Sequence, residues 1–166
     1  MRVTLERHDL LLRDHAGYYR TTLADSHIAS SLLLRSVAFP DSTSGSDQVW
    51  LAYNRQGQRL TLTDQNGTVH SYNYDLLGRP TQDRVTTLAS GVDGAIRRIE
   101  TAYEVRGMVN RVSSLDSASI GLGSVVNEVR WTYNDFFQSI QTYQSHSGVV
   151  NTSTTPSVQQ TYADGS

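Results

Sequence analysis

Apolar and polar residues alternate along residues 53–80, and this alternation predicts a pair of antiparallel strands joined by a tight turn. Leu60 and Leu62 alternate with polar residues in the first half of the stretch, and Tyr72 and Tyr74 do so in the second half. Strict alternation over several residues is typical of a half-buried β-strand. The stretch therefore predicts a β-hairpin.

The expected turns share one short phrase, in which Asp or Asn is followed three positions later by Gly. The phrase occurs at residues 54–57, 64–67 and 75–78. Asp or Asn at the first position of a type I turn caps the local backbone, and Gly at the fourth position adopts the left-handed conformation. Such a turn closes a three-residue hairpin loop. We therefore expect positive φ angles at Gly67 and Gly78.

The flanking residues select one strand register. With residues 65–67 as the loop, Leu62 pairs with His70 and Leu60 with Tyr72, so that leucines and tyrosines share one face. A two-residue turn would slip the register by one and split this apolar set, so we predict the three-residue loop. The opposite face is then expected to be solvated and carries Arg59, Thr61, Thr63, Ser71 and Asn73.

The turn phrase continues along the chain in altered form, with Glu104 replacing Asx before Gly107 and Phe137 replacing Gly after Asn134. A tyrosine directly precedes each of these turns except the one at residues 64–67. The spacings between these tyrosines are 21, 29, 30 and 29 residues for Tyr53, Tyr74, Tyr103, Tyr133 and Tyr162. A period of this size predicts an array of supersecondary units, each of which needs its neighbours to bury an apolar face. The longer periods predict loop insertions at residues 88–93 and 117–124, which are rich in Gly, Ser and Ala.

Further strands are expected on both sides of the central stretch, at residues 49–53, 81–89, 95–103, 108–115, 125–133 and 138–143, with a polar turn at 39–47. Residues 1–36 are less regular. Residues 14–17 have the turn spacing and suggest another hairpin, whereas residues 26–37 fit either a strand or a short helix capped by Ser26. We expect a strand there because the rest of the chain is β. The predicted organisation is an N-terminal segment, 1–36, followed by a hairpin array, 37–166, that is truncated within a repeat.

Composition excludes several classes of function. Apolar residues make up 37% of the chain, with nine tyrosines and three phenylalanines, which suits half-buried sheet surfaces. The net charge of −2 gives no electrostatic reason to expect nucleic acid or an anionic membrane as partner. No apolar stretch reaches membrane-span or signal-peptide length. All 14 basic residues are arginine, which indicates either carboxylate-binding forks or, as we favour, a biased coding sequence.

Residues with catalytic or metal-binding chemistry do not form a recognisable pattern. There is no cysteine, and the histidines have no metal-ligand spacing: His8, His15, His27, His70 and His146. Residues 64–75 begin like a calcium loop, but alternation favours a turn and a strand. Asn66 and Asn151 lie in glycosylation sequons. We therefore predict no catalytic, cofactor-binding or metal-binding residue, and no enzyme activity.

The phrase Tyr74-Asp75-Leu76-Leu77-Gly78-Arg79, preceded by residues 63–67 and Tyr72, closely resembles the YD repeat of rearrangement-hotspot (Rhs) and YD-repeat proteins. The resemblance is strongest over residues 49–85 and weaker at the turns after Tyr103 and Tyr133, where Asp or Gly is replaced. Members of that family include polymorphic toxins, insecticidal toxin-complex subunits and teneurins. They build spirals of β-hairpins that close into shells around a cargo, and many are secreted or attached to the cell surface.

The resemblance implies an all-β, antiparallel array of hairpin repeats that forms a curved sheet, an incomplete segment of a larger spiral or shell. The implied function is that of a non-enzymatic structural segment, with further YD repeats or self-association through sheet edges as partners. The alternative is a carbohydrate- or protein-binding module on the tyrosine-bearing face, with glycans as candidate ligands. The self-cleavage segment and toxin domain of toxin-type members are not recognisable, so no catalytic residue is carried over. The residues assigned to the repeat motif are Tyr53, Gly57, Asp64, Gly67, Tyr72, Tyr74, Asp75, Gly78, Arg79, Tyr103, Gly107 and Tyr133.

Overall fold

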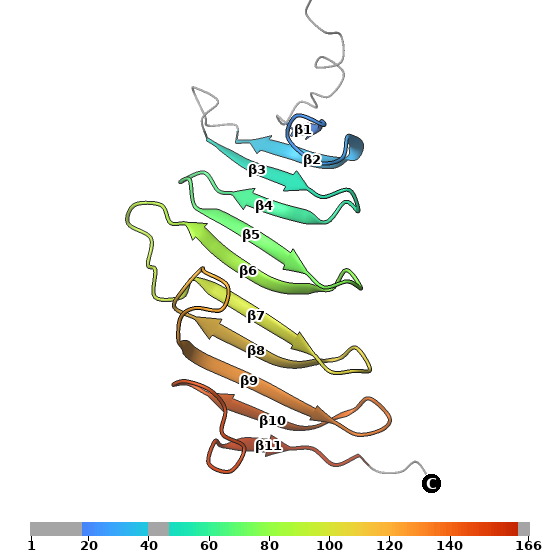
Figure 1. Cartoon of the computed structure of the whole chain (residues 1–166), viewed down its shortest axis with the longest axis vertical. Coiled ribbons are helices and arrows are strands. Elements are labelled where there is room, and N and C mark those ends of the chain that lie inside the picture. Colours follow the sequence, from blue (N-terminus) through green and yellow to red (C-terminus); the bar gives the residue numbers. More distant parts are fainter. Residues whose placement is uncertain (1–17, 40–46, 163–166) are drawn as a thin grey trace, which may run out of the picture. The chain divides into compact units, whose positions relative to one another are not determined.

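A computed structural model of the chain describes residues 18–39 and 47–162, and these residues form β-strands connected by turns and loops (Figure 1). No helix occurs among them, so the prediction of an all-β fold is confirmed. The strands pair in the antiparallel sense. The eleven strands of the described part are β1 (Tyr18–Thr21), β2 (Ser30–Ala38), β3 (Gln48–Tyr53), β4 (Arg59–Thr63), β5 (Val69–Tyr74), β6 (Pro80–Thr87), β7 (Arg98–Tyr103), β8 (Val109–Leu115), β9 (Val125–Tyr133), β10 (Ser139–Ser145) and β11 (Ser157–Gln159).

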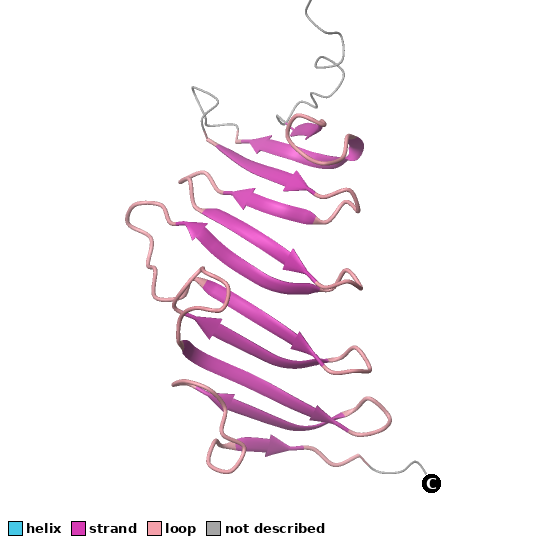
Figure 2. Ribbon diagram, viewed as in Figure 1, coloured by secondary structure: helices cyan, strands magenta, loops and turns pink. Residues whose placement is uncertain are grey.

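Each strand pairs with its successor in the chain, from β1 to β5 and again from β6 to β11; the strands are drawn in magenta in Figure 2. The chain divides into two compact units, of which the first comprises Met1–Tyr72 with Thr87–Ser90 and the second comprises Asn73–Thr86 with Gly91–Ser166. The first unit holds β1 to β4 and most of β5, and the second holds most of β6 and all of β7 to β11. A sheet of this order arises because each strand pairs with its successor through a short connection.

The predicted register of the central hairpin is confirmed. Leu62 lies opposite His70, and the backbone N–H of Asp64 donates to the carbonyl of Thr68 at 3.0 Å. The strand prediction for the segment after Ser26 is confirmed as well, since β2 occupies most of it. The hairpin expected at residues 14–17 and the interior of the turn at 39–47 lie outside the described residues. The division at residue 36 stays a prediction.

Both predicted loop insertions are present, and they account for the uneven repeat length. Residues 88–97 connect β6 to β7, and residues 116–124 connect β8 to β9, whereas a tight turn at residues 64–68 connects β4 to β5. The unit with the tight turn has the shortest tyrosine spacing, 21 residues. Length therefore varies in the connections that lead from one hairpin to the next.

Burial is sparse, as expected for strands that lie in a single layer. Only four hydrophobic residues of the described chain are buried: Tyr53, Leu115, Tyr143 and Val150. In the central hairpin Leu62 and Tyr72 are half-buried, but so are Thr61 and Ser71 on the opposite face. The expected contrast between a covered and a solvated face is therefore wrong for these residues. Neighbouring side chains in the sheet shield the short polar residues about as well as the larger apolar ones.

Candidate functional site

The hairpin turns of the described chain are built by a common set of hydrogen bonds. At Asp64 the carbonyl accepts from the N–H of Gly67 at 3.1 Å, while Oδ1 accepts from Asn66 N and Thr68 N at 2.9 and 2.8 Å. The same bonds recur at Asn54 and Asp75. These side-chain bonds satisfy donors that the strand ladder leaves unpaired. The positive φ angles expected at the turn glycines are confirmed, at 87° for Gly67 and 80° for Gly78.

Asp75 makes the most extensive contacts of these turn residues. Its Oδ2 accepts from Nε of Arg79 at 2.7 Å and lies 2.7 Å from Nη2, so that the guanidinium binds the carboxylate in a fork. The backbone N–H of Arg79, followed by its side chain and by the N–H of Leu77, lowers the pKa of Asp75 below its usual value of 3.8. This turn is therefore stabilised by a carboxylate that stays ionised.

Two later turns keep the backbone geometry although their residues depart from the phrase. At Glu104 the longer side chain binds Nε of Arg106 at 3.0 Å, while Gly107 N donates to the Glu104 carbonyl at 2.9 Å. At Asn134 the side-chain bonds are those of the other Asx turns, and Phe137 takes the place of glycine at a φ of 65°. A non-glycine residue in this region costs roughly 1–2 kcal/mol. Phe137 is the one described residue other than glycine with a positive φ.

The tyrosine period has a specific structural cause within the second unit. The hydroxyl of Tyr103 donates to the carbonyl of Pro80 at 2.7 Å, and the hydroxyl of Tyr133 donates to the carbonyl of Val109 at 2.6 Å. Tyr162 donates to Ser139 at 2.9 Å. In each case the acceptor lies five residues after the first residue of the preceding turn. We call these three hydrogen bonds the tyrosine rungs, because each joins one hairpin to the next.

Arginine side chains link successive turns beside the rungs. The guanidinium carbon of Arg79 lies 4.3 Å from the ring centroid of Tyr103, and Arg79 also lies over Gly107, where an added Cβ would be 3.6 Å from Nη1. Arg106 donates to the carbonyl of Asn134 at 2.7 Å and lies 5.2 Å from the ring centroid of Phe137. The turns after β5, β7 and β9 are therefore connected laterally within the second unit.

The predicted repeat residues fall into two groups at opposite ends of the strands. Tyr53, Gly57, Tyr74, Asp75, Gly78, Arg79, Tyr103, Gly107 and Tyr133 lie at the ends where β3, β5, β7 and β9 finish, whereas Asp64 and Gly67 form the turn at the other end. Tyr72 lies within β5 and stacks on His70, with ring centroids 6.3 Å apart. Burial raises the pKa of Tyr53 and of Tyr133, opposed at Tyr53 by Arg59 and reinforced at Tyr133 by Glu104.

Sequence reasoning missed two buried charges, Arg98 and Glu128. Arg98 Nη1 donates to the carbonyls of Ser117, at 2.7 Å, and Ser119, and Nη2 donates to Leu122 at 2.9 Å. Its Nε lies 2.8 Å from a Glu100 carboxylate oxygen, although its N–H does not point at that atom. The buried guanidinium thus holds the β8–β9 loop in place.

Glu128 anchors a different connection, the one that follows β10. Its carboxylate accepts from the Ser113 hydroxyl at 2.7 Å and from the backbone N–H of Val150 at 3.2 Å. Nothing local in the sequence distinguishes Arg98 or Glu128 from other strand charges, because their partners lie 15–24 residues away.

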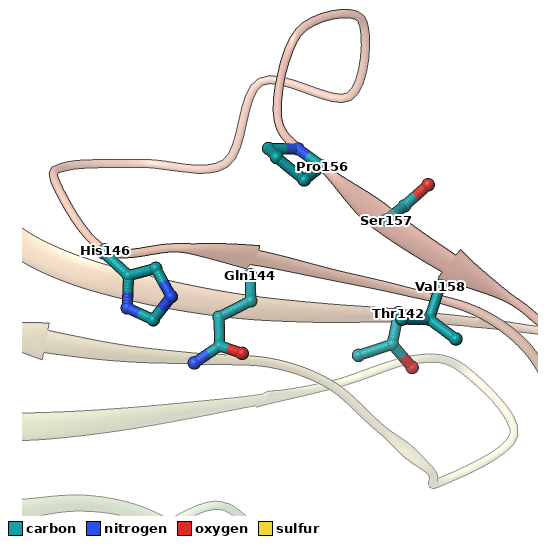
Figure 3. Close-up of a pocket in the computed structure, with 6 residues that line it drawn as sticks. All are labelled: Thr142, Gln144, His146, Pro156, Ser157 and Val158. Atoms are coloured by element: carbon teal, nitrogen blue, oxygen red, sulfur yellow. The ribbon is translucent and has the colours of Figure 1, made fainter.

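A shallow cavity of about 250 Å³ lies on β10 and β11 (Figure 3). Thr142 and Gln144 of β10 line one side together with His146, the residue that follows the strand, and Pro156, Ser157 and Val158 line the other side. The six lining residues are Thr142, Gln144, His146, Pro156, Ser157 and Val158. None of them belongs to the predicted repeat motif. Neither a carboxylate nor a guanidinium lines the cavity, so its polar lining consists of hydroxyl, amide and imidazole groups.

Metal-binding clusters and membrane-spanning helices are both absent from the part of the chain that the structure describes. In residues 18–39 and 47–162 no three His, Cys, Asp or Glu side chains are grouped as a metal site would require. Nor does that part of the chain contain a helix of the length and apolar character needed to cross a bilayer. The tyrosine rungs and the linked turns are therefore the most regular feature to which a function can be attached. No model of a known protein family matches the chain, and no curated protein matches it significantly.

Proposed function

We propose that this chain is a non-enzymatic structural segment of an Rhs/YD-repeat scaffold, of the kind that encloses a cargo or acts at the cell surface. The tyrosine rungs carry this proposal. Their donors, Tyr103, Tyr133 and Tyr162, follow at intervals of 29–30 residues the position that Tyr74 holds in the YD phrase, and each joins its own strand to the preceding hairpin at the same offset. A tyrosine whose hydroxyl is hydrogen-bonded to the backbone of the neighbouring hairpin stabilises the assembly of repeats.

The turn chemistry supports the same proposal. The Asp of the phrase accepts the bonds that close the turn, the Gly provides the left-handed position, and the Arg binds the Asp and stacks on the next tyrosine. The Asp, the Gly and the Arg of the phrase thus each have a structural task. The alternative, a glycan- or protein-binding module on the tyrosine face, requires accessible rings, yet Tyr53 is buried and Arg79 lies over the ring of Tyr103.

The proposal is tested on the protein in its natural source. An antibody raised against this chain, followed by mass spectrometry of the captured polypeptide, is expected to identify a product with further units of 29–30 residues that carry the tyrosine and turn phrase. A captured product without additional units would contradict the proposal. Turnover in a hydrolase panel that is abolished by one His or Asp substitution would replace it with an enzyme.

A further inference from the structure

Five apolar side chains protrude from three consecutive hairpin turns of the second unit, where turn residues are normally polar. Leu77 and Phe136 are each 78% exposed, Phe137 is 57% exposed, and Leu76 and Val105 are fully exposed. The equivalent turn of the first unit carries Arg55 and Gln56 instead. We call the five side chains the apolar tip row: Leu76, Leu77, Val105, Phe136 and Phe137. The three turns are those after β5, β7 and β9.

The tip row is held in place by the arginine links described above. Arg79 connects the first turn of the row to the second, and Arg106 connects the second to the third. In each of the three turns, the backbone N–H that closes the loop donates a hydrogen bond to a carbonyl of its own hairpin. Association at these tips therefore orders little new backbone, which lowers the loop-ordering part of the cost of binding.

Phe137 gives an independent reason to regard the row as functional. It occupies a left-handed position that glycine fills in the other turns of this type, and its ring is largely exposed. Stability alone favours glycine there. Strain retained at an exposed aromatic residue points to a role outside the folding of its own hairpin.

We infer that the apolar tip row is a homodimer interface, in which a second copy of this chain is related by a two-fold axis through the turn that carries Val105. Neighbouring hairpin tips are about 10 Å apart, because two strand spacings separate them. The axis then places Val105 against its own copy and Leu76 against Phe136 of the other chain, at both ends of the interface. The contact is isologous and closes on itself.

Charge and area favour this occupant. Asp75 is paired with Arg79 and Glu104 with Arg106, which leaves Asp135 as the tip charge without an arginine in its own turn. The antiparallel arrangement places the two Asp135 carboxylates at opposite ends of the interface, whereas a parallel arrangement would bring them together. The five side chains expose on the order of 600 Å², close to the ~800 Å² that each partner contributes to a standard interface.

The full chain, which contains no cysteine, provides a direct test. Sedimentation equilibrium is expected to show a dimer in the micromolar range for the wild type and a monomer for Val105→Ser combined with Phe136→Ser. The circular dichroism of this variant should be unchanged, since both side chains are exposed. The matched control, Arg55→Ser with Gln56→Ser in the polar turn of the first unit, should remain dimeric.

Single cysteines then report the symmetry. Under mild oxidation Val105→Cys is expected to form a disulfide-linked dimer efficiently, whereas Leu76→Cys and Phe136→Cys do so only when mixed with each other. A monomeric wild type would overturn the inference, as would linkage through Gln56→Cys as efficient as that through Val105→Cys. Association abolished by Val158→Lys on β11 but unaffected by the tip substitutions would place the contact at the sheet edge and would overturn it too.

Discussion

Removal of one hydroxyl group, by Tyr133→Phe, tests whether the tyrosine rungs hold neighbouring hairpins together. The lost bond is the one from the Tyr133 hydroxyl to the Val109 carbonyl, 2.6 Å long and partly buried. A hydrogen bond of this kind contributes about 1 kcal/mol net, and the ring that fills the space is retained. We therefore expect the free energy of unfolding of the second unit to fall by about 1 kcal/mol. With a slope of about 2 kcal/mol per molar, the urea midpoint would fall by about 0.5 M.

Tryptophan fluorescence allows this measurement to be assigned to one unit. Trp131 lies in β9 beside Tyr133, and a Trp50→Phe background removes the tryptophan in β3 of the first unit. Tyr143→Phe in β10 is the matched control within the same unit, since no described residue accepts a hydrogen bond from its hydroxyl, and it should leave the midpoint unchanged. Equal midpoints for Tyr133→Phe and Tyr143→Phe would refute the rung interpretation, because the tyrosine would then act through its ring alone.

Three further substitutions test individual contacts. Phe137→Gly should raise the free energy of unfolding, measured by chemical denaturation, by up to about 1 kcal/mol. The relief of the left-handed strain exceeds the loss of the exposed contact with Arg106. A fall in the free energy of unfolding would show that the strain is absent. Because the folded state lowers the pKa of Asp75, its contribution is complete above the usual value of 3.8 and is lost as the pH falls through the folded pKa. Acid titration by circular dichroism should therefore destabilise the wild type more than Asp75→Asn, which keeps the turn acceptor, and parallel curves would contradict this. Arg98→Met should cost about 3 kcal/mol and raise amide hydrogen exchange at residues 117–124, whereas unchanged exchange would mean that the loop does not depend on the guanidinium.

The sequence allowed the local features of the fold to be predicted, because each depends on residues close together in the chain. The three-residue loop, the Leu62 to His70 register and the positive φ of Gly67 follow from turn chemistry and alternation over a few residues. The spacing of the tyrosines indicated a repeat but not its cause, since the acceptor of each hydroxyl is a backbone carbonyl, which every residue possesses. No sequence pattern marks that choice.

The features that could not be predicted depend on distant partners or on the absence of covering layers. Arg98 and Glu128 bind loop backbone groups 19–24 residues away, and nothing adjacent in the sequence signals this. The polar face with Thr61 and Ser71 was expected to be solvated by analogy with sheets packed on a core. In a single layer both faces have the same cover, so alternation no longer separates inside from outside.

The tyrosine rungs give the second unit a direction. In each rung the hydroxyl donor belongs to the later hairpin and the carbonyl acceptor to the earlier one. Each hairpin therefore has one side that donates a tyrosine hydroxyl and an opposite side that accepts one through a backbone carbonyl. A hairpin grafted between two others in the reverse sense would bring donor to donor on one side and acceptor to acceptor on the other. Such units can therefore be recombined or engineered only head to tail. Each tyrosine must follow, in the chain, the hairpin whose carbonyl accepts its hydrogen bond.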